Sequence, residues 1–258
     1  FYLIFHYSFS EQKPSFSELL IPQFRKYKVK TKSLSFNDRK KLLAFKNINK
    51  KELQAFSKEL ANIILTDDIS NVTIQNIRTH GNKIAHYSVA TGEVHNVLIK
   101  NLLVENVVRH PLSFNTRSTR CVYTNCVVEQ SVLLDQHSAM NEQNLFDNIK
   151  LYIDGSVHES AKFRLFSLGG SALWAPGHGA FSTFYNIDLN FANIPEDKNT
   201  PIVLHGSKGK QGVSARLIGI HANHPLTIDY PINAYIEMTN TKLPFSSLYE
   251  YQLNQRTK

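Results

Sequence analysis

A short motif recurs five times between residues 72 and 187 and limits the possible folds of this chain more than any other feature. Each copy has an apolar residue, one spacer, an asparagine and another apolar residue. The asparagines are separated by 25, 24, 23 and 38 residues and are Asn76, Asn101, Asn125, Asn148 and Asn186. A sixth copy follows 33 residues later with Gly219 in the asparagine position. Five copies in one register predict a repeat architecture.

Apolar residues recur at three positions around the asparagines, and we expect them to face inward. They lie two before it (Ile74, Ile99, Tyr123, Phe146, Phe184), one after it (Ile77, Leu102, Cys126, Ile149, Ile187) and three after it (Val104, Val128, Leu151, Leu189). Because the parity changes at the asparagine, the strand should bend there. We expect each asparagine to face inward at this bend and to hydrogen-bond the asparagine of the next repeat as a ladder.

A repeat of about 24 residues, with three short strands, predicts an all-β solenoid, the right-handed parallel β-helix, over residues 69–258. The longer intervals at the end predict loop insertions, which in solenoids gather at the binding face. A leucine-rich solenoid is the alternative, but its leucine consensus and its helical half are missing.

Residues 1–68 lack the repeated motif of the rest of the chain. They are predicted to be a separate N-terminal segment, either an insertion or a cap. Apolar residues at three- and four-residue steps over 35–65 predict a basic helical hairpin. Residues 24–58 contain twelve Lys or Arg against two acidic residues, so this stretch carries +10 while the whole chain carries +8. A solvated helical face is expected; nucleic-acid binding is the alternative and would be sensitive to salt.

The composition allows a sizeable core, since 42% of the 258 residues are hydrophobic. Cys121 and Cys126 are the two cysteines and are predicted to be small buried residues rather than a metal site. The chain has no run of 18 apolar residues, and its first five residues lack the features of a signal peptide. Because it does not begin with Met, we expect a fragment or a processed form.

Two stretches, His137–Ile149 and Ser247–Arg256, resemble the C-terminal portion of bacterial pectin-lyase-like β-helix proteins of polysaccharide-utilisation systems, especially those of Bacteroidetes. The resemblance covers roughly residues 69–258 and implies the fold and a polysaccharide substrate. It also implies a secreted, periplasmic or cell-surface location. The family includes lyases, hydrolases and members of unknown activity. The Lys and Arg pattern of its alginate and chondroitin lyases is missing, and Gly177-His178-Gly179 matches its hydrolase motif without the companion aspartates.

Polar residues recur at equal distances from the asparagines, and equal offsets in a solenoid predict a line along one flank. Ten residues after an asparagine lie His86, Asp135 and His158, and nine after lies His110. Sixteen after lie Arg117 and Arg164. A column of His and Asp beside a column of Arg suits a chain of acidic sugars, since Arg binds carboxylate or sulfate and His transfers protons near neutral pH.

Two reaction mechanisms are compatible with these residues, elimination by a lyase and hydrolysis. A lyase needs a base for the C5 proton, a cation for the uronate carboxylate and an acid for the leaving oxygen. His137 or His110 is the predicted base, with Arg109, Arg117 or Arg120 as the cation. A hydrolase needs two carboxylates, for which Asp135, Glu142 and Asp147 are the candidates.

We therefore predict a carbohydrate-active enzyme that cleaves an acidic polysaccharide or oligosaccharide, with a lyase favoured over a hydrolase and over a non-catalytic binding protein. The predicted catalytic residues are His137, Arg117, His110, Asp135 and Glu142. The predicted substrate-binding residues are Arg109, Arg120, His86, His158, Arg164, Trp174 and His178. No metal-ligand set and no cofactor are predicted, with calcium left open. A monomer is expected, with no membrane span and no nucleic-acid partner.

Overall fold

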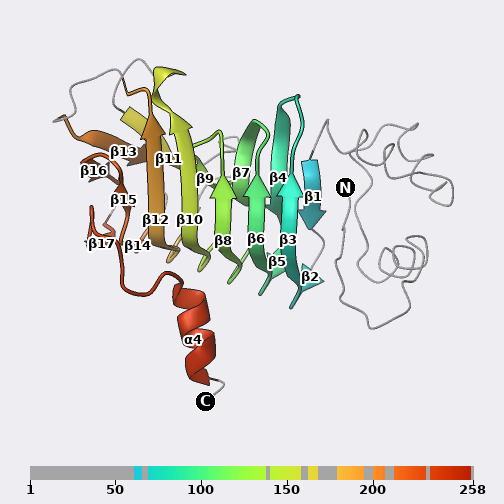
Figure 1. Cartoon of the computed structure of the whole chain (residues 1–258). Helices are drawn as coiled ribbons and strands as arrows, with labels where there is room; N and C mark the ends of the chain where they lie inside the picture. The colour runs from blue at the N-terminus through green and yellow to red at the C-terminus, as the bar shows by residue number, and fades with distance from the viewer. Residues whose placement is uncertain are drawn as a thin grey trace.

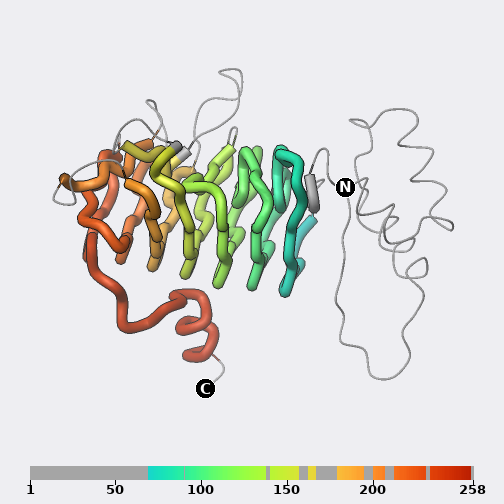
Figure 2. Tube along the Cα trace, turned by 45° about the horizontal axis from the view of Figure 1, so that its top comes forward, coloured from blue at the N-terminus to red at the C-terminus, as the bar shows by residue number. Residues whose placement is uncertain are grey.

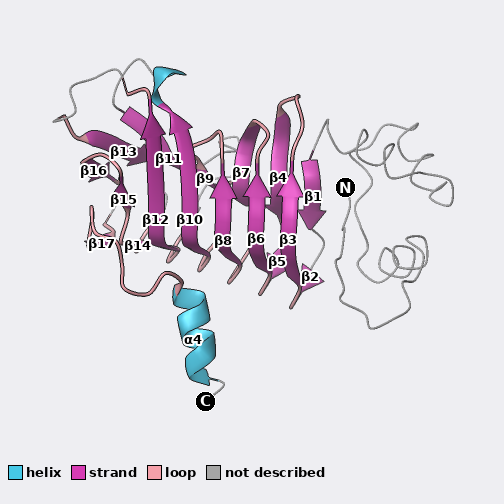
Figure 3. Ribbon diagram, in the orientation of Figure 1, coloured by secondary structure: helices cyan, strands magenta, loops and turns pink. Residues whose placement is uncertain are grey.

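The computed structural model describes residues 61–65, 69–137, 140–157, 162–167, 179–194, 200–206, 212–230 and 233–256 of the chain. Strands make up most of this part, and every strand pairing between them is parallel. The structure is therefore all-β in character and built from parallel sheets (Figure 3).

The asparagine motifs lie in one eight-stranded sheet, which we call the motif sheet. Its strands follow one another in chain order, with β15 pairing beside β12 (Figure 1). They are β3 (Thr73–Thr79), β6 (Leu98–Val104), β8 (Val122–Val128), β10 (Leu145–Asp154), β12 (Thr183–Ala192), β14 (Arg216–Ile218), β15 (His221–Ala222) and β17 (Tyr235–Glu237).

A second sheet of seven strands, which we call the site sheet, is also in chain order. Its members are β1 (Ala61–Leu65), β4 (Ala85–Thr91), β7 (Val108–Phe114), β9 (Leu134–Gln136), β11 (Lys162–Ser167), β13 (Ile202–Gly206) and β16 (Leu226–Asp229). The short 3-10 helix η2 (Gly155–Val157) follows β10. Successive repeats lie side by side (Figure 2), and each repeat from β3 to β13 gives one strand to each sheet.

A third, narrow line of pairing runs beside the two large sheets. It begins with β2 (Ile69–Ser70) and β5 (Val94–His95), which pair in parallel. Isolated parallel bridges continue it from His95 to Thr119, Glu142 and Ala180. A repeat of the chain therefore contacts its neighbours along three lines, which keeps residues of equal offset close together.

The asparagine positions share one backbone conformation. All five have a positive φ between 50° and 59°, and Gly219 in the sixth copy has a φ of 69°. Asparagine tolerates this left-handed region better than most residues, and glycine does so without steric cost. The repeat register read from the sequence is therefore confirmed by the backbone.

The asparagine ladder forms, but with one interruption. Asn101 donates to Asn76, Asn148 to Asn125 and Asn186 to Asn148, at 2.8, 2.7 and 2.9 Å. Asn125 donates instead to Glu250, so the ladder is interrupted between Asn101 and Asn125. The prediction that the asparagines face inward is wrong for Asn76 and Asn101, which are exposed. The bend carries these amides to the outer corner, where they avoid the cost of desolvation.

The predicted inward positions are confirmed, since all of them are buried except Ile77, which packs partly buried against the core. Stacked rings fill the centre: Phe146 lies between Tyr123 and Phe184, with ring centroids 6.0 and 5.2 Å away. Burying a large apolar side chain contributes roughly 1.5–3 kcal/mol, so these stacks stabilise the repeat strongly. Cys121 and Cys126 are free and fully buried, as predicted.

The N-terminal helix predicted over 35–65 is wrong in its last residues, because residues 61–65 form strand β1. This strand pairs in parallel with β4, from Ala61 opposite Tyr87 to Leu65 opposite Thr91. The sheet edge offers backbone partners, and β-branched Ile63 and Ile64 favour the extended form. The rest of the predicted hairpin lies outside the described residues.

A C-terminal helix, α4 (Leu248–Arg256), was not predicted from the sequence. Its first turn is anchored to the motif sheet by Asp147, which accepts hydrogen bonds from the backbone N–H groups of Leu248 and Tyr249, at 2.8 and 3.3 Å. Ser247 caps the helix by accepting from the N–H of Glu250. Within the described part of the chain, no helix has the length and apolarity needed to cross a bilayer.

Candidate functional site

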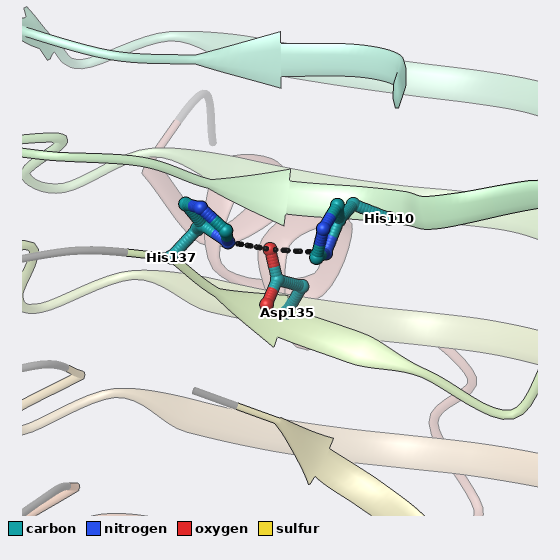
Figure 4. A group of neighbouring side chains, drawn as sticks. All are labelled: His110, Asp135 and His137. Carbon is teal, nitrogen blue, oxygen red and sulfur yellow. Dashed lines mark ion pairs between the residues drawn. The ribbon is translucent and has the colours of Figure 1, made fainter. Parts of the chain in front are cut away.

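Two histidines and an aspartate from neighbouring repeats meet on the site sheet. His110 lies in β7, Asp135 lies in β9, and His137 directly follows β9. The Nδ1 atoms of His110 and His137 lie 3.2 and 3.3 Å from the same Asp135 oxygen, Oδ2 (Figure 4). We call these three residues the His–Asp–His cluster.

The pairing of β7 with β9 fixes the position of Asp135. Leu112 and Ser113 in β7 stand opposite Leu134 and Asp135 in β9, and both leucines are fully buried in the core. The Ser113 hydroxyl donates to Asp135 Oδ2 at 2.6 Å. The carboxylate is therefore held by rigid, packed backbone rather than by a loop.

The cluster leaves several buried polar atoms unsatisfied. Asp135 is fully buried, and its second oxygen, Oδ1, has no hydrogen-bond partner among the described residues. The Nδ1 atoms of His110 and His137 are also buried, and their close contacts with Oδ2 do not have the geometry of hydrogen bonds. Buried polar groups are nearly always paired, so an unpaired group requires a functional explanation.

Asp135 is held in its charged form. Burial by itself raises the pKa of Asp135, but the contacts from His110 and His137 outweigh burial and lower the pKa to about 2. A buried carboxylate that stays ionised attracts positive charge, whether an imidazolium or an ion.

Aromatic side chains extend the cluster along β4. The Tyr87 ring stacks on His110, with centroids 5.0 Å apart and planes at 26°, and meets His137 edge-on at 5.9 Å. Burial, followed by the charge of Asp135, raises the pKa of Tyr87 to about 12, so its hydroxyl keeps its proton at neutral pH. His86 lies 5.0 Å from His110, ring to ring. Burial and the nearby charges of His110, Arg109 and His137 lower the pKa of His86.

The predicted arginines are not brought together with the cluster as a second column. Arg117 is exposed, lies in the turn after β7 and pairs with Glu93 at 2.5 Å. Arg120 is exposed next to Thr119 on the third line of pairing, and Arg164 is exposed on β11, opposite His205. Arg109 precedes His110 in β7, and its charge contributes to the lowered pKa of His86.

The three predicted carboxylates lie in three different places. Asp135 belongs to the cluster, whereas Glu142 lies on the third line, bridged to Thr119 and Ala180. Asp147 lies under α4 on the motif sheet and accepts from Thr124 as well as from Ser247 and the helix N-terminus. His158, Trp174 and His178 lie outside the described residues.

Two members of the site were missed in the sequence, Tyr87 and Ser113. Tyr87 stands opposite His110 in the β4–β7 pairing, and Ser113 stands opposite Asp135 in the β7–β9 pairing. The repeat length of 22 or 23 residues links each of them to a predicted residue, so the same offset argument could have found both. His95 and His221 are hydrogen-bonded to Thr119 and Gly219, as expected for structural histidines.

No family model matches this chain, and no curated protein or solved structure gives a significant match. The functional assignment therefore depends on the geometry of the site.

Proposed function

We propose that this chain is a right-handed parallel β-helix that cleaves an acidic polysaccharide by β-elimination. Both large sheets follow chain order, and the repeats from β3 to β13 contribute one strand to each, which is the arrangement expected of successive coils. One flank of a stack of coils presents residues of equal offset in a line. An extended polysaccharide chain can bind along that line. Because a polysaccharide is too large to enter a cell, we propose a secreted, periplasmic or cell-surface location.

The gathering of His110, Asp135, His137 and Tyr87 on one sheet is the observation that carries the proposal. The side chains of His110 and His137 are 16% and 17% exposed while their Nδ1 atoms are buried, so each ring is open to solvent on the side away from Asp135. A base must have an accessible nitrogen, and Nε2 lies on that side of the ring. The charged Asp135 stabilises the imidazolium that forms when a proton is taken up.

The elimination step divides among these groups as follows. His137 or His110 takes the C5 proton of a uronate, and the electron pair of that C–H bond forms the C4–C5 double bond. The C4–O bond breaks, and Tyr87, which is protonated at neutral pH, gives its proton to the leaving glycosidic oxygen. Arg109 neutralises the uronate carboxylate, whose charge grows as the proton leaves. The products are a chain with a free hydroxyl and a chain that ends in an unsaturated uronate.

Hydrolysis is less well supported by the same geometry. A hydrolase needs two carboxylates on either side of one bond, about 5–9.5 Å apart. Asp147, one of the candidates, is occupied by the anchoring of α4, and Glu142 lies on a different line of the fold from Asp135. Elimination needs only one carboxylate, in a supporting role.

The test is incubation of the purified full chain with a panel of uronate and sulfated polysaccharides. Elimination produces the ultraviolet absorbance of the unsaturated uronate together with new reducing ends. His137→Ala should abolish this signal, and His221→Ala, which removes a histidine bonded to the Gly219 carbonyl, should keep it. New reducing ends without the absorbance would support hydrolysis, and binding without either would support a non-catalytic protein.

A further inference from the structure

We propose that His110, Asp135 and His137 form a binding site for one divalent transition-metal ion, with zinc as the best fit. This inference goes beyond the proposed cleavage reaction and does not depend on it.

The distances in the cluster match the spacing of ligands around such an ion. Zinc binds imidazole nitrogen and carboxylate oxygen at about 2.0–2.1 Å, so two ligands at a tetrahedral angle lie about 3.3 Å apart. The two Nδ1 atoms lie 3.2 and 3.3 Å from Asp135 Oδ2. One ligand atom from each of the three residues lies within 4.8 Å of the others, so small side-chain rotations suffice to close the set around an ion.

The unsatisfied atoms are a second and independent sign of a ligand. Asp135 Oδ1 and both Nδ1 atoms are buried and without hydrogen bonds among the described residues. Leaving such groups unpaired in the interior is unfavourable, because they have lost their hydrogen bonds to water. A cation held between Asp135 Oδ2 and the two Nδ1 atoms would satisfy both nitrogens at once, whereas a single hydrogen bond would satisfy only one of them.

The donor set selects the class of ion. Imidazole ligands suit zinc and the neighbouring first-row metals, whereas calcium and magnesium prefer a shell of oxygen atoms. Three protein ligands leave at least one position of the ion open for water or substrate. The Ser113 hydroxyl, which donates to Asp135 at 2.6 Å, is the outer-shell contact that orients the ligating carboxylate.

A bound ion would also change the proposed reaction. An imidazole that binds metal through Nδ1 carries its proton on Nε2, and it can no longer take a proton from the substrate. The metal-bound protein should therefore be unable to use His110 or His137 as the base. This consequence rests on the proposed function, whereas the metal site itself does not.

The experiment measures metal rather than cleavage. The full chain is treated with a chelator and dialysed against Zn²⁺ or Co²⁺, with Ca²⁺ and Mg²⁺ as hard-ion controls, and bound metal is determined by elemental analysis. We expect one Zn²⁺ per chain, and Co²⁺ should give visible absorption bands with nitrogen ligands. His110→Ala and His137→Ala should weaken binding by more than about 100-fold, since even outer-shell changes cost up to that much.

Two further variants separate ligation from misfolding. Asp135→Asn keeps the shape of the side chain but removes its charge and should also lose the ion, whereas His221→Ala should bind like the wild type. Circular dichroism checks that each variant keeps its sheets. Undiminished Zn²⁺ binding in His110→Ala or Asp135→Asn, no binding by the wild type, or a preference for Ca²⁺ would each overturn the inference. Metal binding, together with no cleavage of any polysaccharide by the chelator-treated, metal-free protein, would defeat the proposed function alone.

Discussion

Asp135 and Asp147 are both buried aspartates on parallel strands, but they differ in how many hydrogen bonds their carboxylates accept. Asp147 accepts from Thr124, from Ser247 and from two backbone N–H groups of α4. Asp135 accepts one hydrogen bond, from Ser113, and faces two imidazoles while its other oxygen has no partner among the described residues. Burial alone therefore does not identify a functional aspartate. A carboxylate oxygen without a hydrogen-bond donor is more informative.

The two regions also shift the acidity of their carboxylates in opposite directions. Burial raises the pKa of Asp147, because its neutral hydrogen bonds only partly replace water. At Asp135 the two histidines reverse the effect of burial and bring the pKa to about 2. The motif sheet therefore uses a carboxylate to fasten a helix, and the site sheet keeps one charged beside groups that can transfer protons or bind an ion.

The different roles of Asp135 and Asp147 can be tested most directly by exchanging each for asparagine and measuring the rate of elimination. Asp135→Asn removes the charge that stabilises an imidazolium, so we expect the rate to fall by about 10²–10⁴-fold. Asp147→Asn keeps an acceptor for the N-terminus of α4, so its rate per folded molecule should equal that of the wild type. Ultraviolet absorbance of the unsaturated product gives both rates, and a loss confined to Asp147→Asn would reverse the assignment of the two regions.

Truncating Asp147, which anchors α4, should reduce the stability of the protein. Asp147→Ala leaves Thr124, Ser247 and the first N–H groups of α4 without their acceptor, so we expect the free energy of unfolding to fall by about 2–4 kcal/mol. Urea denaturation followed by circular dichroism measures this loss. Asp147→Asn serves as the control and should recover most of the stability, and an unchanged midpoint in Asp147→Ala would show that α4 is not held by this contact.

The sequence predicted the register of the repeats well, because that register depends on local chemistry. A left-handed bend that suits asparagine or glycine, with apolar positions at fixed distances on either side, can be recognised without knowing any contact between distant residues. The burial of Tyr123, Phe146 and Phe184, two positions before the bend, confirms it. The anchoring of α4 could not be predicted in this way, since Asp147 and Leu248 are 101 residues apart and lie outside the repeat pattern.

Part of the candidate site could also be predicted from the register of the repeats. Offsets of nine or ten residues brought His86, His110 and Asp135 to one place because the strands of the site sheet keep their register. The same argument failed to assemble Arg117 with them, since it lies in the turn after β7, where φ is 55° and the chain changes direction. Offsets therefore predict neighbours within strands better than neighbours in turns.

The opposite pKa shifts predict opposite effects of acid on the metal-free protein. Asp135 has a lowered pKa, so its contribution, about 2 kcal/mol, is present above the unfolded pKa near 4 and is lost as the pH falls toward 2. Asp147 has a raised pKa, so its contribution is lost as the pH rises through the folded value and is fully present below the unfolded value. Between about pH 4 and 2, Asp135→Asn should therefore lose stability less steeply than the wild type.

The measurement is the free energy of unfolding in urea at several pH values for the wild type and both asparagine variants. Asp147→Asn should become unstable in acid at least as steeply as the wild type, because it lacks the group that gains stability on protonation. Parallel curves for all three proteins would mean that neither aspartate titrates differently in the folded and unfolded states.

The smallest expected effect concerns the ladder, where backbone conformation and hydrogen bonding can be separated. Asn125 has a φ of 55°, accepts from Asn148 and donates to Glu250. Asn125→Ala loses both hydrogen bonds and places a Cβ without a polar group in the left-handed region, so we expect a loss of about 1–3 kcal/mol. Asn125→Gly loses the same hydrogen bonds but accepts the backbone conformation freely, and should lose less. If alanine and glycine destabilise equally in urea, the asparagine is needed for its hydrogen bonds; if glycine matches the wild type, it is needed for the bend.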